Sequence, residues 1–388
     1  MEKCPFKKGY NMKKIDKHLL EANIQKQIQS DLDEQNICGV SVLVAQSGKE
    51  TYRAHFGIVS SDSNIPITEN TTFRMASMTK PITTVAALIL VDKGLLSLDD
   101  TIDEYIPEFS EMSVLTSDSE IVPTNEKITV RNILTHTSGI GSGEAWTRTL
   151  PLMKFDDIQR TDNFVKFLSE QPLSFVPGTK EEYSGIAAFS LLVVIVEKIC
   201  GCTFEEFLKK ELFDPCRMKD TTFCPTEEQW KRLVVMHDKK DGKAIVGEMY
   251  DGCVFEMYPP TNTLAGAGLI SSLEDYYHFA SMLLSNGSFE GKRIVSESLI
   301  KEMSRIQLPP ELHHTKESWG LGVRVIKNDD HKALPKGAYG WSGAYGTHFW
   351  IDPLNEIVAI YMRNSKYDGG SGSRIAAKFE VDVAASLI

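Results

Sequence analysis

Hydrophobic and polar positions follow distinct patterns along the first part of the chain, and each pattern predicts a different element. Over residues 13–35, apolar side chains recur every three or four positions, which is typical of an amphipathic helix. Residues 40–45 and 51–57 are short strand-like runs, and the polar turn at residues 47–50 between them predicts a β-hairpin. Residues 82–91 are apolar nearly all round, as in a buried helix.

The middle of the chain is mostly helical by the same criteria, and strand patterns return towards its end. Helices are expected over residues 130–134, 161–169, 186–200, 203–212, 272–284 and 296–306. Strands are expected over residues 322–326, 346–352 and 356–362, followed by a last helix over residues 373–388. The polar, irregular stretches at residues 112–127, 141–160 and 226–260 are expected to be rich in loops.

Strands at both ends of the chain flank this helical middle, and that order determines the expected fold. The simplest arrangement joins the terminal strands in one sheet and inserts the helices between them, which is an α+β fold. We expect a sheet domain of residues 1–70 with 315–388 and a mostly helical inserted domain of residues 71–314, with an active site between them. A chain of 388 residues is long enough for two such lobes.

Charge and composition disfavour several classes of protein. The chain is 42% hydrophobic and 24% charged, and its net charge of −11 disfavours nucleic acid as a partner. Its longest apolar runs, residues 85–91 and 187–196, are too short and too closely flanked by charge to span a bilayer. The charged N-terminus lacks the apolar core of a secretory signal, so a cytoplasmic protein is expected.

Cysteine usage points to the same compartment. Seven cysteines at scattered spacings do not form the pattern of a disulfide framework, so free thiols are expected. Cys200-Gly201-Cys202 lacks both the spacing and the second pair of a zinc site. We therefore expect no metal and no organic cofactor.

A serine and a lysine stand where a loop enters the buried helix. Ser77 and Lys80 are three residues apart, so on a helix they share one face. A serine hydroxyl needs an adjacent base to act as a nucleophile, and burial near a helix N-terminus lowers the pKa of a lysine. Ser-x-x-Lys alone is more often a capping serine and a surface lysine. The apolar helix behind it, with Pro81 near its start, favours the catalytic interpretation.

Two further stretches have both a chemical and a structural interpretation. His136 lies in the run Leu134-Thr135-His136-Thr137-Ser138-Gly139 and is a candidate base, but the small hydroxyl residues around it favour tight turns and a structural histidine. The glycine-bearing turn at residues 264–270 lacks the spacing and the downstream lysine of a phosphate-binding loop. Close backbone packing is the favoured reason for its glycines.

Three patches stand in a fixed order along the chain: Ser77-Met78-Thr79-Lys80, Tyr183-Ser184-Gly185 and Trp341-Ser342-Gly343. With them the chain resembles the serine β-lactamase and penicillin-binding-protein superfamily, above all its class C β-lactamase branch with the related family VIII carboxylesterases, D-amino-acid peptidases and statin-type acyltransferases. The likeness covers roughly residues 36–365 and includes residues 134–139, 177–179, 266–269 and 349–353. It implies a β-lactamase/transpeptidase-like fold, with an antiparallel sheet flanked by the N- and C-terminal helices and a helical domain inserted.

The resemblance also implies roles for individual residues. Ser77 would attack a carbonyl carbon and become acylated, while Lys80 and Tyr183 would share the proton transfers. The third motif would lie on an edge strand beside the serine, where the amide of Ala344 joins the amide of Ser77 in an oxyanion hole. A glycine at position 343 would leave room for the acyl group.

Two departures from the family pattern bear on the substrate. The second motif usually ends in an asparagine that holds the substrate amide, and Gly185 stands in its place. The third motif usually begins with a lysine that attracts a carboxylate, and Trp341 replaces it, as in family VIII esterases. Losing a charge-assisted hydrogen bond costs roughly 1.5–3 kcal/mol of binding, so acidic β-lactams and peptide C-termini should be poor substrates. Arg363 is a further candidate for a positive charge, although strand-end arginines are usually solvated.

These observations lead to the hypothesis of a serine hydrolase that acts on small carboxylic esters through an acyl-enzyme. A β-lactamase, D-Ala-type peptidase or amidase of the same fold is one alternative, and an acyltransferase is another. The intact Ser77, Lys80 and Tyr183 disfavour a non-catalytic penicillin-binding protein. The missing Gly-x-Ser-x-Gly elbow disfavours an α/β-hydrolase. Nothing in the sequence indicates an oligomeric state.

Overall fold

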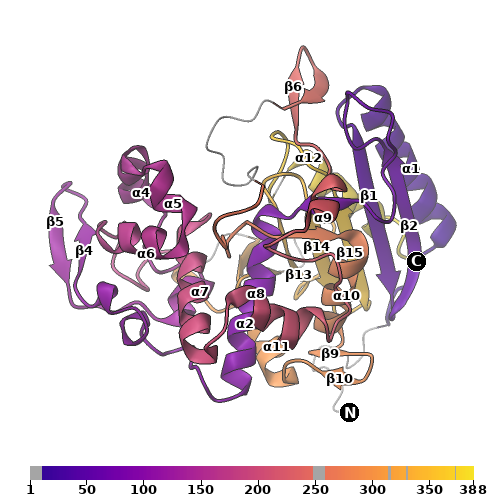
Figure 1. The fold of residues 1–388 in the computed structure, drawn as a ribbon. Coiled ribbons are helices and arrows are strands. Elements are labelled where there is room, and N and C mark those ends of the chain that lie inside the picture. The colour runs from indigo at the N-terminus through magenta and orange to yellow at the C-terminus, as the bar shows by residue number, and fades with distance from the viewer. Residues whose placement is uncertain (1–10, 248–257, 313–315, 329–330, 372) are drawn as a thin grey trace.

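A seven-stranded antiparallel sheet joins the two ends of the chain (Figure 1). The computed structural model describes residues 11–247, 258–312, 316–328, 331–371 and 373–388. The strand order is β11-β12-β13-β14-β15-β1-β2. The strands are β1 Gly39–Gln46, β2 Lys49–Gly57, β11 Glu317–Trp319, β12 Arg324–Ile326, β13 Tyr339–Ser342, β14 His348–Asp352 and β15 Ile357–Met362. The N-terminal hairpin enters the sheet through β1, which pairs with the last strand β15.

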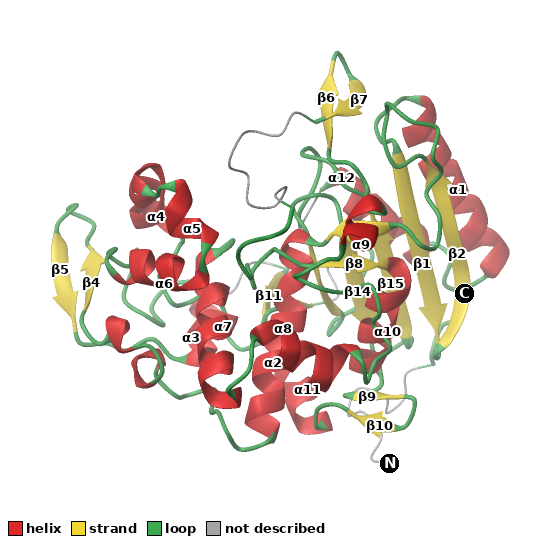
Figure 2. Ribbon diagram, viewed as in Figure 1, coloured by secondary structure: helices red, strands yellow, loops and turns green. Residues whose placement is uncertain are grey.

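The two faces of this sheet carry different helices. Successive side chains of a strand point to opposite faces, so Val40, Val42 and Val44 of β1 pack on one side and Leu43 on the other. The first side is covered by α1 Lys17–Asp33 and α12 Arg374–Ala384, whose apolar stripes belong to the same buried cluster. The second side is covered by α10 Leu273–Leu284. Figure 2 shows α1 running beside β1 and β2.

The segment between the terminal strands is mostly helical, and its core is built on two apolar helices. Twelve of the 14 residues of α2 Thr79–Asp92 and nine of the 14 residues of α7 Ala187–Cys200 are buried, because both helices are apolar around most of their circumference. The shorter helices are α3 Val130–Leu134, α4 Gly143–Thr149, α5 Phe155–Gln159, α6 Thr161–Ser169, α8 Phe204–Leu208, α9 Glu227–Lys231 and α11 Glu297–Met303. Short strand pairs are β3 Thr72–Arg74 with β8 Ile270–Ser272, β4 Met112–Leu115 with β5 Ile121–Thr124, β6 His237–Lys240 with β7 Lys243–Val246, and β9 Ser288–Phe289 with β10 Lys292–Arg293.

The expected α+β architecture is confirmed, with strands from both ends in one antiparallel sheet and the helices between them. The long expected helices and the two hairpins of the main sheet are also present. The division into a sheet domain of residues 1–70 with 315–388 and a helical domain of residues 71–314 stays a prediction.

Three stretches expected to be loops contain regular structure. Residues 112–127 include the β4–β5 hairpin, which the pattern missed because β5 has only four residues, contains Pro123 and is largely exposed. Residues 141–160 contain α4 and α5, which are too short for a clear helical period. Residues 226–260 contain α9 and the β6–β7 hairpin, and residues 248–257 of that stretch lie outside the described ranges.

The resemblance implied that the third motif lies on an edge strand, and this is wrong for the sheet as a whole. It lies on β13, which has β12 and β11 beyond it. However, β12 pairs with β13 only at Tyr339 and Gly340. Trp341 and Ser342 extend past that ladder, so at these two residues β13 is paired with β14 but has no partner on the side of β12.

Five cysteines in the described ranges are free thiols, namely Cys38, Cys200, Cys202, Cys216 and Cys224. The expectation of free thiols also covered Cys4 and Cys253, which lie outside those ranges. Within the same ranges no single helix is long and apolar enough to cross a membrane. The one pair of helices that together have the necessary length and apolar composition is α7 with Phe204–Phe213, and the two are bent by 75° relative to each other.

Candidate active site

Ser77 lies in a strained turn between β3 and α2. The 3₁₀ turn Ala76–Met78 joins the strand to the helix, and Ala76 within it has a φ of +46°, in the left-handed region that a residue with a side chain rarely adopts. Backbone strain of this kind persists only where the surrounding structure enforces it, and it gathers at functional sites. Ser77 lines a cavity of about 670 Å³ and is 9% exposed. The hydroxyl is therefore buried at the floor of an open pocket.

Lys80 is one helical turn beyond Ser77 and is completely buried. Its Nζ atom donates to the carbonyl oxygens of Gly185 at 2.6 Å and Gly266 at 2.9 Å, and lies 3.4 Å from Ser77 Oγ. Burial lowers the pKa of Lys80, because the charged form loses its hydration. A neutral amine has two protons, one for each carbonyl, and a lone pair left for the serine. The geometry thus fits the predicted pairing of serine and lysine.

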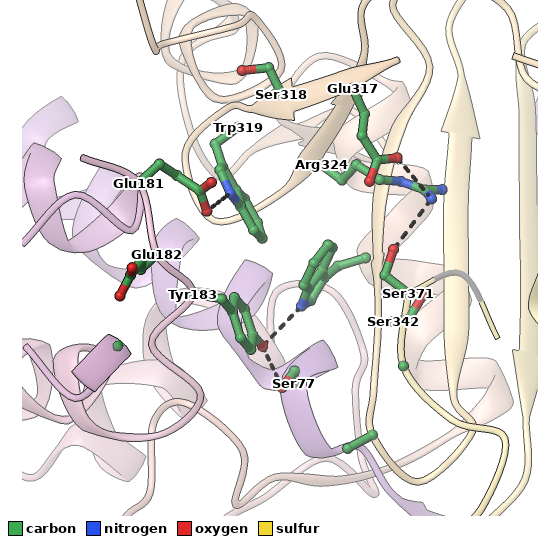
Figure 3. A pocket seen from close by; sticks show the side chains of 14 residues that line it. Ser77, Glu181, Glu182, Tyr183, Glu317, Ser318, Trp319, Arg324, Ser342 and Ser371 are labelled. Carbon is green, nitrogen blue, oxygen red and sulfur yellow. Dashed lines mark hydrogen bonds and ion pairs between the residues drawn. The ribbon is translucent and has the colours of Figure 1, made fainter. Parts of the chain in front are cut away.

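Tyr183 contacts the same serine from the loop that precedes α7. Its Oη atom lies 2.7 Å from Ser77 Oγ, and Trp341 Nε1 donates to that Oη at 3.4 Å, as the dashed lines in Figure 3 show. Lys80 Nζ lies 4.8 Å from the centre of the tyrosine ring. Ser77, Lys80 and Tyr183, from two distant parts of the chain, therefore meet at the serine hydroxyl, as the resemblance implied.

Gly343 is required for a different reason from the one expected. A Cβ atom at this position would collide with the carbonyl oxygen of Met75 and with Thr347 Oγ1. Thr347 in turn donates from Oγ1 to the Met75 carbonyl at 2.9 Å. The glycine therefore lets the end of β13 lie against the segment that carries Ser77. Ala344, the next residue, lines the same cavity as the serine.

A family model described as Beta-lactamase matches residues 24–382 of the chain. The chain belongs to the Beta-lactamase family. It is 29% identical over 365 residues to Protein Rv1367c of Mycobacterium tuberculosis (strain ATCC 25618 / H37Rv), covering 87% of this chain and 88% of that one. It is 28% identical over 391 residues to Esterase EstB of Burkholderia gladioli, covering 92% and 94%. Among solved structures it is similar to EstCE1, a hydrolase with promiscuous acyltransferase activity, with a TM-score of 0.81, 21% identity and coverage of 94% and 99%.

His136 has a structural place in this Beta-lactamase-family site. Its Nδ1 atom accepts from the amide of Ser184 at 3.1 Å, and its own carbonyl accepts from the amide of Glu182 at 3.0 Å. Its ring packs 4.6 Å from that of Tyr183 and 4.3 Å from that of Trp319. Complete burial, with Lys80 nearby, places the pKa of His136 well below its ordinary value. The histidine is neutral and holds the tyrosine loop, which fits the structural interpretation.

The glycine-bearing turn at residues 264–270 packs tightly against the tyrosine loop. A Cβ atom at Gly266 would lie 2.9 Å from the carbonyl oxygen of Ile186. Thr83 Oγ1 donates to the Ala265 carbonyl at 2.8 Å, which fixes the turn on α2. Close packing is therefore the reason for this glycine. The sequence did not show that its carbonyl also accepts from Lys80.

The cavity walls include residues that the sequence patterns did not single out. Trp319 on β11 donates from Nε1 to Glu181 Oε1 at 2.8 Å, and its ring centre lies 4.5 Å from that of Trp341. Glu182, Glu317 and Arg324 also line the cavity (Figure 3). β11 has only three residues, which is too short to produce an alternating pattern. The pocket therefore combines aromatic faces with carboxylates at its rim.

Arg363 does not bring a positive charge to the substrate side. It is 2% exposed, and its Nη2 atom donates to the backbone carbonyls of Tyr367, at 3.1 Å, and Asp368. It is absent from the lining of the cavity that contains Ser77. Its partners are these carbonyls, the Asp368 carboxylate at 3.8 Å and the face of the Tyr367 ring rather than solvent, unlike those of the usual solvated arginine at a strand end.

Proposed function

We propose that this protein is a serine hydrolase that cleaves carboxylic esters of modest size through an acyl-enzyme on Ser77. The observation that carries the proposal is the position of Ser77 Oγ, 2.7 Å from Tyr183 Oη and 3.4 Å from Lys80 Nζ, on the floor of an open cavity. A nucleophile needs such a base within hydrogen-bond reach. The name of the relative Esterase EstB, which is 28% identical along most of both chains, supports the choice of an ester.

In the proposed reaction the Ser77 oxygen attacks the ester carbonyl carbon while its proton passes to the Tyr183–Lys80 pair. The tetrahedral oxyanion would accept hydrogen bonds from the amides of Ser77 and Ala344, each contributing roughly 3 kcal/mol. The same pair returns the proton to the leaving alcohol as the acyl-enzyme forms. Water, activated by that pair, then attacks the acyl carbon, and Ser77 regains its proton as the carboxylic acid leaves.

The residues that line the cavity favour the binding of neutral or cationic esters over the binding of acidic substrates. Glu181, Glu182 and Glu317 line the pocket, and Arg324 among them is paired with Glu317 and Glu380. Trp341 presents an indole where a lysine would attract a carboxylate. An anionic β-lactam would therefore meet like charges there, and among the described residues that line the cavity the one cation, Arg324, is already paired.

Burst kinetics with p-nitrophenyl butyrate and with nitrocefin, on the natural chain and on Ser77→Ala in parallel, test this proposal. We expect a Ser77-dependent burst and turnover of the ester, with little hydrolysis of nitrocefin. Fast turnover of nitrocefin would identify a β-lactamase or peptidase instead. A burst without turnover that is relieved by added alcohol would identify an acyltransferase, an activity also described for the structural neighbour EstCE1.

We also propose a cytoplasmic location, because the described cysteines are free thiols, which is typical of a reducing compartment. Cell fractionation with an antibody against the protein tests this. Recovery from the periplasm or the medium would overturn the proposal.

A further inference from the structure

One buried hydroxyl joins the turn after β13 to the backbone just before Ser77. The turn spans residues 343–347, between β13 and β14, and its residue Ala344 lines the cavity. Thr347, at the end of the turn, is 1% exposed and donates from Oγ1 to the carbonyl oxygen of Met75 at 2.9 Å. Met75 stands two residues before Ser77. The Thr347 side chain therefore connects the two segments that carry Ala344 and Ser77.

Hydrogen bonds within each segment hold both ends of this contact. In the turn, the amide of Gly343 donates to the Thr347 carbonyl at 2.7 Å, and the amide of Gly346 donates to the Gly343 carbonyl at 3.0 Å. On the other side, the amide of Met75 donates to the carbonyl of Leu269 at 2.9 Å. The hydroxyl of Thr347 is thus a link between two pieces of backbone that each have a fixed conformation.

The segment directly after β15 forms a second link between the same two parts. Asn364 is 2% exposed, and its side-chain amide accepts from the amide of Arg74 at 2.9 Å and donates to the Arg74 carbonyl at 3.0 Å. It pairs with β3 in this way much as a neighbouring strand would. The next residue, Ser365, donates from its amide to the carbonyl of Tyr345 in the turn, at 2.9 Å.

Arg363 supports the turn from the same segment. Its guanidinium lies against Gly346, where an added Cβ atom would come within 2.7 Å of Nε. Gly346 has a φ of +91°, so a side chain is excluded there by the backbone as well. A few residues later, the amide of Gly370 donates to the Gly343 carbonyl at 2.9 Å. Residues 363–370 therefore pack along the turn and hold it in place.

The position of this turn matters for the chemistry proposed at Ser77. In that reaction the amides of Ser77 and Ala344 donate to the oxyanion, and such donors act only at hydrogen-bond distance from the place where the charge develops. The two amides belong to different segments, so their separation depends on what joins those segments. A misplacement of about 1 Å in a catalytic site costs on the order of 10²-fold in rate.

We propose that Thr347 is a positioning residue, whose hydroxyl fixes the separation between the Ser77 and Ala344 amides. Thr347 does not line the cavity, so it acts through the backbone and not by touching the substrate. Asn364 and Arg363 hold the same turn from the other side. This inference rests on the proposed ester hydrolysis at Ser77. It predicts that loss of the hydroxyl weakens the stabilisation of the tetrahedral intermediate and leaves the nucleophile and its base in place.

The test compares two substrates that differ in one atom, p-nitrophenyl butyrate and its thiono analogue O-(p-nitrophenyl) thionobutyrate. In the thiono ester the intermediate carries its negative charge on sulfur, which is larger than oxygen and a weak hydrogen-bond acceptor, so it gains little from the two amides. Attack by Ser77 and release of nitrophenolate are common to both esters. The ratio of their kcat/KM values, oxo over thiono, therefore reports the oxyanion hole, and any loss of folded enzyme or of base strength cancels.

Three variants show whether the hydroxyl of Thr347 sets this ratio. Thr347→Val keeps the shape of the side chain and removes the hydroxyl, and we expect the ratio to fall about tenfold, less than the roughly 10²–10³-fold cost of losing a whole donor. Thr347→Ser keeps the hydroxyl and should hold the ratio within about twofold. Thr72→Val is the matched control, because Thr72 is a buried threonine of β3 that donates to the Gln229 carbonyl at 3.3 Å. We expect it to keep the natural ratio.

Several results would overturn the inference and leave the proposed function intact. One is an unchanged ratio in Thr347→Val while turnover still depends on Ser77. Another is an equal fall in Thr347→Ser, which would assign the effect to the lost methyl group, or in Thr72→Val, which would assign it to a general loosening of β3. A natural ratio no higher than that of uncatalysed hydrolysis would mean that no oxyanion hole acts.

Turnover that survives in Ser77→Ala would instead remove the proposed function itself. If Thr347→Val fails to fold because its extra methyl group crowds the Met75 carbonyl, Thr347→Ala takes its place. That variant also lacks the hydroxyl but adds no bulk, and the same tenfold fall is expected.

Discussion

Lys80 donates its shortest hydrogen bond, at 2.6 Å, to the backbone carbonyl of Gly185, the position where the resemblance implies a substrate-binding asparagine in the family pattern. The contact involves no side chain of residue 185, so a substitution there leaves it in place. A Cβ atom at Gly185 would approach only Tyr183 Cε1, at 4.0 Å. The proposed base and the position that would select a substrate amide are therefore adjacent, but either can be changed without the other.

Restoring the two family side chains should change the substrate preference. In the double variant Gly185→Asn with Trp341→Lys, the asparagine side chain can hydrogen-bond the amide of the substrate, and the lysine provides a positive charge for its carboxylate. We expect kcat/KM for an acidic amide such as nitrocefin to rise about tenfold or more relative to p-nitrophenyl butyrate, since a charge-assisted hydrogen bond contributes roughly 1.5–3 kcal/mol. Trp341→Phe, which adds no charge, is the control. An unchanged ratio would place the specificity in the surrounding loops.

Removing the nucleophile should abolish turnover without unfolding the protein. Ser77→Ala deletes one oxygen that faces an open cavity and keeps the Cβ atom, so the melting temperature should shift by less than about 2 °C. Intact-mass measurement after incubation with p-nitrophenyl butyrate should show an added butyryl group on the natural chain and none on the variant. Acylation of the variant would move the nucleophile to another residue.

The two proton-transfer groups should each affect the rate strongly. Lys80→Ala and Tyr183→Phe should each lower kcat by about 10²–10⁴. Lys80→Arg should be as inactive as the alanine variant, because a guanidinium stays charged and offers no lone pair. Since burial lowers the pKa of Lys80, kcat/KM of the natural protein should rise with pH as the amine loses its proton and then level off. A normal rate in Lys80→Arg would remove the lysine from the base role.

The parts of the site that could be predicted from the sequence are those encoded locally or by a motif. Ser77 and Lys80 are three residues apart at the start of an apolar helix, so their contact follows from helical spacing. Tyr183 has no such local signal, and only its motif, taken in order with the others, placed it beside the serine. The α+β fold followed in the same way from strands at both ends and helical periods between them.

The rest of the site depends on tertiary contacts that leave no pattern in the chain. Trp319 reaches the cavity through a three-residue strand that is recognisable only by its pairing with β12. His348 and Ser342 meet because β13 and β14 pair in one register, and a shift of one residue would separate them. Glu380 joins them only because α12 docks on that face. Such residues are identified by register and docking rather than by composition.

His136 should affect both the fold and the tyrosine. In His136→Phe the ring still packs on Tyr183 and Trp319, but the buried amide of Ser184 loses its acceptor, which costs roughly 1–3 kcal/mol. Because Tyr183 is then held less firmly, we expect kcat to fall about tenfold while KM changes little. Urea unfolding and steady-state kinetics measure the two effects. If the variant is destabilised but its kcat is unchanged, this histidine stabilises the fold without affecting how Tyr183 acts.

The same residue should make the natural protein sensitive to mild acid. The pKa of His136 is lower in the folded state than in the unfolded chain, so in mild acid the unfolded state binds a proton that the native state does not bind. Its contribution is complete above about pH 6.5, and stability falls by about 1.4 kcal/mol per pH unit below that value. Urea midpoints between pH 7 and pH 5 should therefore drop less steeply in His136→Phe than in the natural protein.

Glu380 should stabilise the protein in a different pH range. Its pKa is about 2 in the folded protein against an ordinary value of 4.5, so its stabilising contribution is present above pH 4.5 and is lost as pH falls towards 2. At pH 7 Glu380→Gln should lower the free energy of unfolding by about 3 kcal/mol, because Arg324 loses a buried counter-charge. Near pH 2 the variant and the natural protein should have the same urea midpoint.

Glu317→Gln is the matched control, since the Glu317 side chain is 32% exposed and its pairing with Arg324 should contribute at most about 1 kcal/mol. If both variants lose the same free energy of unfolding, either carboxylate stabilises Arg324 equally well. The buried Glu380 would then contribute no more than Glu317 to the packing of β12, β14 and α12.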